Sequence, residues 1–185
     1  MRRGFKAEAE RIASKVRTEM GKRAFDPIDA AALAQHVGAQ VRRADELTSR
    51  SKLEALERLQ PGAFSACTFA LAGKHIIVYS PLASVGRTQS DIAHEVAHIL
   101  LKHSVSTVQT IGGVNFFTCD VDEEQEATWL AGCLLLPRPL LYRAARGGLS
   151  TAAIAQAFGV SETMAAFRLR TTGVMRQLHV PSPDR

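Results

Sequence analysis

Hydrophobic residues recur every three or four positions through much of the chain, a spacing typical of amphipathic helices. Residues 5–20, 88–103 and 122–136 follow it. Two shorter stretches, residues 63–70 and 75–79, are instead rich in β-formers and flank a short turn, so they predict a hairpin. We therefore expect an α+β fold that is mostly helical and contains a small antiparallel sheet.

The remaining segments predict a C-terminal region distinct from the main domain. Residues 104–119 predict a loop or an irregular strand. Residues 151–158 and 161–170 predict two short helices arranged like a helix-turn-helix. We therefore place a boundary near residue 140, with a main domain over residues 1–140 and a C-terminal region over residues 141–185.

Composition and cysteine usage predict a cytoplasmic protein. Hydrophobic residues make up 46% of the chain and charged residues 22%, as in ordinary globular proteins. The basic start is not followed by an apolar core, and no apolar run is long enough to cross a membrane. The three cysteines, Cys67, Cys119 and Cys133, show no CxxC pairing, which favours reduced thiols.

Charge is distributed unevenly, with an acidic middle between two basic ends. Residues 1–23 and 138–185 carry an excess of Lys and Arg, whereas residues 24–137 carry an excess of Asp and Glu. Basic ends can contact nucleic acid or an acidic partner, but solvated helix faces explain most such surpluses. Charge therefore leaves open a weak contact with DNA.

The motif that carries chemistry is His94-Glu95-Val96-Ala97-His98. A helix turns by about 100° and rises by about 1.5 Å per residue, so His94 and His98 lie one turn apart and can bind one metal ion. Glu95 lies close enough to face a water molecule on that ion. HExxH is the zinc-peptidase pattern for this reason, with two neutral imidazoles as ligands and the Glu as the base.

The faces of this helix favour the metal site over an ordinary core helix. Ile92, Val96 and Ile99 form one apolar stripe, and the two histidines cluster on the opposite side. The alternative is that the histidines only make ordinary hydrogen bonds. A helix that is buried on one side and carries a polar cluster on the other suits the wall of a cleft.

His103 is not expected to be a ligand. On the helix predicted over residues 88–103, His103 lies about 180° from His94, in line with the apolar stripe. The longer HExxHxxGxxH spacing is also absent, because Leu101 and Ser104 stand at its Gly and His positions. We therefore interpret His103 as a core or helix-end histidine.

The third ligand should be a carboxylate from the helix predicted over residues 122–136. Glu126 shares a face with Leu130 and Cys133, whereas Glu124 is rotated about 160° away from it. A carboxylate among apolar side chains needs compensation of its charge, and a metal ion supplies it. Pairing of Glu126 with an arginine is the alternative. Cys133 lies two turns further on and is interpreted as packing.

The two helical segments together resemble the ImmA/IrrE family of bacterial metallopeptidases. That family pairs an AHExxH helix with a downstream E-x-E-A-N-x-F-A-x-x-L-L-M-P helix, and residues 124–137 here read E-Q-E-A-T-W-L-A-G-C-L-L-L-P. The hairpin precedes the metal helix in the family's order. Residues 154–161, with Arg168 and Leu169, resemble the family's C-terminal helix-turn-helix-like element.

The resemblance implies a zincin-like domain and a zinc-dependent endopeptidase. It implies one zinc ion held by His94, His98 and Glu126, with Glu95 as the catalytic base. The implied substrate is a helix-turn-helix transcriptional repressor in a stress-response or mobile-element circuit. Thr128 replaces the family's Asn, and this puts the orientation of the ligands in question rather than the ligands themselves.

Two alternative functions remain, and the oxyanion-stabilising residue is not identified. The chain can be a DNA-binding regulator that uses residues 149–170, with Arg168 and Arg170 on a recognition helix. It can also be a toxin or interaction protein held by an antitoxin. Tyr79, Tyr142 and His75 are candidates for an oxyanion donor, and none of these three is assigned.

Overall fold

The computed structural model describes residues 1–103, 107–111, 114–118 and 120–179, so Cys119 and the last six residues of the predicted C-terminal region lie outside the described residues. The described part is mostly helical with little sheet, as predicted. In chain order its elements are α1 (Phe5–Glu19), α2 (Ala30–His36), β1 (Ala39–Arg43), the 3-10 turn η1 (Ala44–Glu46), α3 (Arg50–Leu59), β2 (Ala66–Leu71), β3 (Lys74–Tyr79), α4 (Val85–Leu101), β4 (Thr107–Ile111), β5 (Val114–Thr118), α5 (Val121–Leu135), α6 (Arg138–Arg146), α7 (Thr151–Phe158), α8 (Glu162–Thr172) and α9 (Val174–His179).

The larger sheet is mixed and has the strand order β1-β3-β2. The predicted hairpin is present, since β2 and β3 pair antiparallel with Thr68 opposite Ile77. Strand β1 adds to β3 in parallel, with Val41 opposite Ile77, and this pairing was not predicted. Within residues 104–119, the structure has a second antiparallel pair, β4 and β5, in place of the expected loop or irregular strand.

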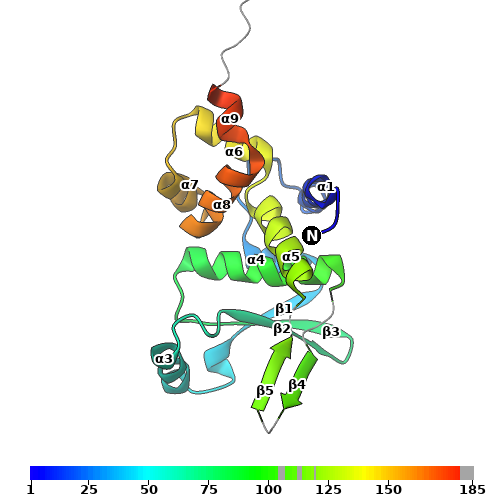
Figure 1. Ribbon diagram of the computed structural model, residues 1–185, viewed down its shortest axis with the longest axis vertical. Helices are drawn as coiled ribbons and strands as arrows, with labels where there is room; N and C mark the ends of the chain where they lie inside the picture. The colour runs from blue at the N-terminus through cyan, green and yellow to red at the C-terminus, as the bar shows by residue number, and fades with distance from the viewer. Residues whose placement is uncertain (104–106, 112–113, 119, 180–185) are drawn as a thin grey trace, which may run out of the picture.

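Helix α4 lies between this sheet and helices α5, α6, α8 and α9 (Figure 1). Its buried apolar residues, among them Ile92 and Val96, belong to a single hydrophobic cluster that also includes Ile77 from the sheet and Leu130 from α5. Helix α5 packs against α4 on one side and α1 on another. The predicted apolar stripe of α4 therefore faces the core, and the histidine side is left beside α5.

The two central helices begin earlier than predicted. Ser84 caps α4, because its side chain accepts a hydrogen bond from the backbone N–H of Arg87. Asp120 caps α5 and accepts from the backbone N–H groups of the next turn. Both are ordinary N-caps, and each lengthens its helix by a residue or more beyond the predicted start.

The C-terminal helices pack into the same hydrophobic cluster as the rest of the chain. The two helices predicted over residues 151–170 are present as α7 and α8, and Ile154 and Met164 belong to the cluster. The start of α8 contacts α4, where the Ser161 backbone N–H donates to Ser90 Oγ at 3.1 Å. The boundary near residue 140 stays a prediction. None of the helices within the described ranges is long and apolar enough to cross a membrane.

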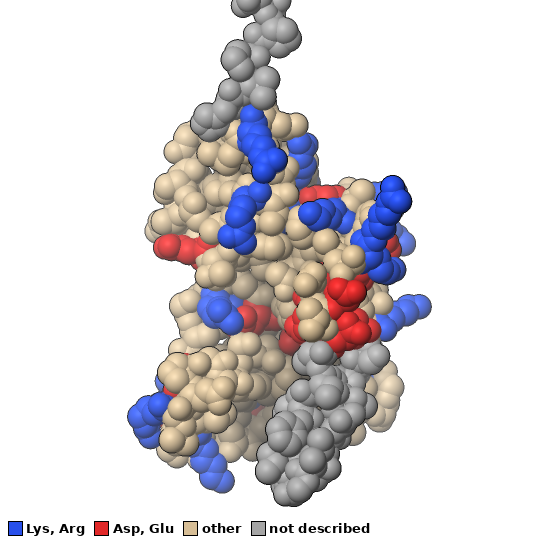
Figure 2. All heavy atoms as spheres, viewed as in Figure 1, with Lys and Arg blue, Asp and Glu red and all other residues tan. Residues whose placement is uncertain are grey.

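Charged side chains follow the pattern seen along the sequence. Acidic side chains gather over the start of α5, and basic ones lie over α8 and α9 (Figure 2). The acidic group includes Asp122, Glu123 and Glu124 in the first turn of α5. Negative charge at a helix N-terminus is stabilised by the helix dipole, so this acidic cluster also favours helix formation.

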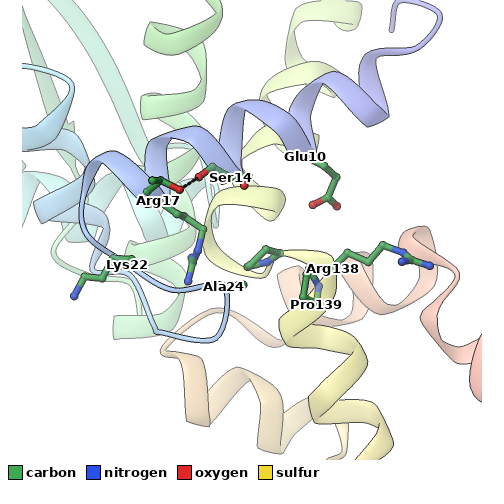
Figure 3. A pocket seen from close by; sticks show the side chains of 9 residues that line it. Glu10, Ser14, Arg17, Lys22, Ala24, Arg138 and Pro139 are labelled. Carbon is green, nitrogen blue, oxygen red and sulfur yellow. Dashed lines mark hydrogen bonds between the residues drawn. The ribbon is translucent and has the colours of Figure 1, made fainter.

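Two buried arginines fix the C-terminal end of α5. Arg17 donates to the carbonyl of Leu134 at 2.7 Å, and Arg168 donates to the carbonyl of Leu136 at 3.0 Å. These carbonyls would otherwise lack partners in the last turn. Figure 3 shows Arg17 pointing from α1 toward the loop that carries Ala24, beside a pocket of about 330 Å³. The arginines thereby join α1, α5 and α8 into one body.

The close contact between α4 and the turn before α8 predicts a sensitive position at Gly86. A Cβ atom there would lie 2.4 Å from the carbonyl oxygen of Val160. Overpacking of this kind costs about 1–3 kcal/mol, and the gain in helix propensity is at most about 1 kcal/mol. Urea unfolding should therefore show that Gly86→Ala lowers the free energy of unfolding by about 1–2 kcal/mol. Gly147→Ala is the matched control and should change the free energy of unfolding less, because the atoms nearest to its added Cβ lie at 3.4 Å. Equal stabilities for the two variants would contradict the contact.

Candidate metal centre

Helix α4 places the two motif histidines side by side. Nε2 of His94 and Nε2 of His98 lie 3.0 Å apart, and both side chains are only partly buried. This arrangement follows from their spacing of four residues, which sets them on successive turns of one helix face. The two nitrogens therefore point to one location on the surface of α4.

Glu124 completes this cluster from α5. Its carboxylate oxygens lie 3.1 Å from Nε2 of His94 and 3.4 Å from Nε2 of His98. One ligand atom from each of the three residues falls within 4.8 Å of the others. Two imidazoles and one carboxylate are the donor set of catalytic zinc sites, which leave a further position open for water or substrate. His94, His98 and Glu124 could hold a metal ion.

Glu126 lies away from the histidine pair and contacts the N-terminal segment. The backbone N–H of Arg2 donates to its carboxylate at 2.8 Å, and the Arg2 side chain donates to both oxygens at 3.0 and 3.1 Å. The arrangement is therefore the arginine pairing considered as the alternative. Burial by itself would raise the pKa of Glu126, but the hydrogen bonds and charge of Arg2 outweigh it and lower that pKa.

The difference from the sequence expectation has a geometrical cause. A helical wheel shows that Glu126 shares the buried face of α5, and Glu126 is indeed buried. The wheel does not show which neighbour covers each face. Helix α1 and its preceding residues cover the face of Glu126, and α4 covers the face of Glu124 and Thr128.

The electrostatic surroundings keep His98 neutral. Burial and, to a smaller extent, the neighbouring His94 lower the pKa of His98 to about 4, although Glu124 opposes the shift. A metal ion binds the neutral imidazole, because the lone pair must be free. His98 is therefore in the ligand form at neutral pH, without competition from a proton.

Glu95 lies beside the cluster in a protected position. Thr68 on β2 donates to its carboxylate at 2.6 Å. Burial raises the pKa of Glu95, and the Thr68 hydrogen bond and His94 only partly oppose this. A carboxylate with a raised pKa is a better proton acceptor at neutral pH. The geometry is thus suited to general base catalysis next to a metal ion.

Comparison with known protein families identifies the chain. The model of the peptidase M78 family, described as the IrrE N-terminal-like domain, matches residues 34–170. The chain belongs to this family. The resemblance inferred from the two motifs is therefore confirmed, and a peptidase activity is supported. No curated protein and no solved structure gave a significant match.

His103 takes a position that the sequence analysis missed. Helix α4 ends at Leu101, and Lys102 adopts a left-handed conformation with φ of 55°, which turns the chain back. Nδ1 of His103 then lies 3.0 Å from Nδ1 of His98. The predicted position of His103, about 180° from His94, assumed that the helix extended to residue 103. His103 is a helix-end histidine, as interpreted, but it touches a candidate ligand.

A second contact supports His94. Thr128 Oγ1, one turn after Glu124, lies 3.5 Å from Nδ1 of His94. Thr128 stands where the ImmA/IrrE pattern has Asn, and its hydroxyl can accept a hydrogen bond from that ring nitrogen. The substitution flagged in the sequence therefore retains a polar partner for the ring.

Several other residues singled out in the sequence lie elsewhere. Arg168, proposed for DNA reading, is fully buried and also pairs with Glu10 at 2.6 Å. Arg170 is exposed. Cys133 lies in the hydrophobic cluster, as interpreted, and burial raises the pKa of its thiol to about 12. The oxyanion donor stays unassigned.

A groove of about 710 Å³ opens beside His94 and leads toward the C-terminal helices. Its lining includes Asp91 and Thr128 near the cluster and Phe167 and Arg170 on α8. A cleft of this size next to a polar cluster is a common form of binding site. Helix α8 thus forms one wall of the cavity that adjoins the candidate metal centre.

Proposed function

We propose that this protein is a zinc-dependent endopeptidase with His94, His98 and Glu124 as zinc ligands and Glu95 as the base. The observation that carries the proposal is the convergence of two imidazoles and a carboxylate beside a partly buried Glu95. Glu124 takes the place that the sequence analysis gave to Glu126. Zinc is the ion that this donor set and the peptidase family favour.

Zinc, Glu95 and Thr68 have separate roles in the proposed peptide hydrolysis. Bound zinc would supply a Lewis acid that polarises the scissile carbonyl and lowers the pKa of water. Glu95 accepts a proton from the attacking water, and transfers it to the leaving amine when the C–N bond breaks. Thr68 holds one oxygen of Glu95, so that the other is left for this proton transfer.

The substrate enters as an extended segment of a protein chain. Strand β2 is at the edge of its sheet, and its Thr68 touches Glu95, so the strand runs beside the reacting atoms. An extended peptide can add to such an edge through backbone hydrogen bonds. We propose a helix-turn-helix repressor as the protein that supplies this segment, on the basis of the resemblance to the ImmA/IrrE family.

Cleavage of a candidate repressor tests this function. Zinc-loaded protein is incubated with helix-turn-helix repressors from the same organism and, separately, with unfolded casein, and new termini are located by mass spectrometry. We expect internal cleavage of the repressor that stops when a chelator removes the zinc and that His94→Ala abolishes. A protein that binds zinc stoichiometrically and leaves both substrates intact would overturn the peptidase proposal. Cleavage of casein alone would overturn the choice of substrate.

DNA recognition receives less support than peptide hydrolysis. Of the two arginines that suggested a recognition helix, Arg168 is buried and bonded to the C-terminal end of α5. The start of α8, which would enter a major groove in a helix-turn-helix protein, is bonded to Ser90 of α4. We therefore assign the C-terminal helices a role in forming the groove.

A further inference from the structure

A line of polar groups, buried at His103 and Glu126, leads from the candidate metal centre to the N-terminal segment. It begins at His98, whose Nε2 faces Glu124 and whose Nδ1 lies 3.0 Å from Nδ1 of His103. Nε2 of His103 lies 3.8 Å from a carboxylate oxygen of Glu126. Arg2 contacts that carboxylate through both its backbone and its side chain.

One set of proton positions satisfies every contact in this line. If Nε2 of His98 offers its lone pair to a metal, the ring carries its proton on Nδ1 and donates to Nδ1 of His103. His103 must then carry its own proton on Nε2, which points toward Glu126. The negative charge of Glu126, 3.8 Å away, favours a proton at this nitrogen, and Arg2 balances that charge. The reverse order would place a proton on the ligand nitrogen of His98.

The burial of these groups indicates that their pairing matters. The side chains of His103 and Glu126 are 6% and 5% exposed. A buried carboxylate and a buried imidazole are unfavourable unless they are hydrogen-bonded. In known metal sites, a partner on the second ring nitrogen fixes the orientation and tautomer of a ligating histidine. Here that partner is a second histidine, which in turn faces a carboxylate.

We propose that His103 and Glu126 are positioning residues that fix the ring orientation and tautomer of His98, and that Arg2 holds Glu126 in place. This inference rests on the proposed zinc site. It assigns a role to Glu126 that differs from the ligand role expected from the sequence. It also makes the N-terminal segment, which precedes the family match at residue 34, a support of the metal centre.

Zinc affinity, measured by competition with a chromophoric chelator, tests this inference without any activity assay. We expect Glu126→Gln and His103→Ala to weaken zinc binding by about 10–100-fold. His103→Asn retains an acceptor near the position of Nδ1 and should recover part of this loss. Glu123→Gln removes the same charge from the same turn of α5 and is the matched control, which should bind zinc as wild type does.

The outcomes separate this inference from the proposed function. A wild-type protein that does not bind zinc would overturn the metal site itself. A wild type that binds zinc, with Glu126→Gln and His103→Ala binding equally well, would overturn the positioning role alone. Circular dichroism of each metal-free variant shows whether it has folded. If Glu126→Gln fails to fold, Arg2→Met is measured instead, because the Arg2 side chain is 60% exposed. The zinc affinity of Arg2→Met should fall several-fold, and an unchanged affinity overturns the positioning role.

Discussion

Replacing Glu95 by Gln is expected to reduce peptide hydrolysis by about 10²–10⁴-fold, the range typical for loss of a general base. The amide has nearly the same shape as the carboxylate and can still accept the hydrogen bond from Thr68, but it cannot take a proton from water. Because Glu95 is not among the clustered ligand atoms, zinc should remain bound. Rates are measured on a peptide that spans the cleavage site, and zinc content by mass spectrometry of the purified protein.

Asp91→Asn is the matched control for this variant. Asp91 precedes Glu95 by one turn of α4, and its carboxylate is bound by Arg87 at 2.9 Å. Its replacement removes the same charge near the site but no proposed proton acceptor, so we expect the rate to change far less. Full activity of Glu95→Gln would show that another group accepts the proton.

Replacing Glu124 by Ala is expected to weaken zinc binding by more than about 100-fold, because residues that only orient a ligand already contribute 10–100-fold. The carboxylate is the only candidate ligand from α5 among the described residues, and its removal leaves two imidazoles from one helix. Equilibrium competition with a chelator measures the affinity. Peptide hydrolysis should be lost in parallel.

The same experiment distinguishes the two glutamates of α5. We expect the loss of affinity to be greatest for Glu124→Ala, smaller for Glu126→Gln and absent for Glu123→Gln. A strong loss for Glu126→Ala together with normal binding by Glu124→Ala would support the ligand first expected from the sequence. It would also mean that the start of α5 rotates when zinc binds.

Much of the fold could be predicted from local patterns. The periods of hydrophobic residues located α1, α4, α5, α7 and α8, and the β-rich stretches located the hairpin of β2 and β3. The structure also contains α6, α9 and the pair β4–β5, which were not predicted. These elements are short, and short segments carry weak periodic signals.

The HExxH motif illustrates what local geometry is able to determine. His94 and His98 lie one turn apart on one helix, so their spacing places both rings on the same face, where their Nε2 atoms lie 3.0 Å apart. The same helix places Glu95 next to them. No contact with a distant segment is needed to predict that these three residues lie together.

The third metal ligand and the partners of the buried arginines depend on contacts between residues that are far apart in the sequence. The sequence by itself determined the family, the metal helix and the buried face of α5. Only the tertiary structure decided that Glu124 meets the histidines, that Glu126 meets Arg2 and that His103 turns back to His98. The physical reason is that a helix period specifies which residues share a face, whereas packing between helices specifies what each face contacts.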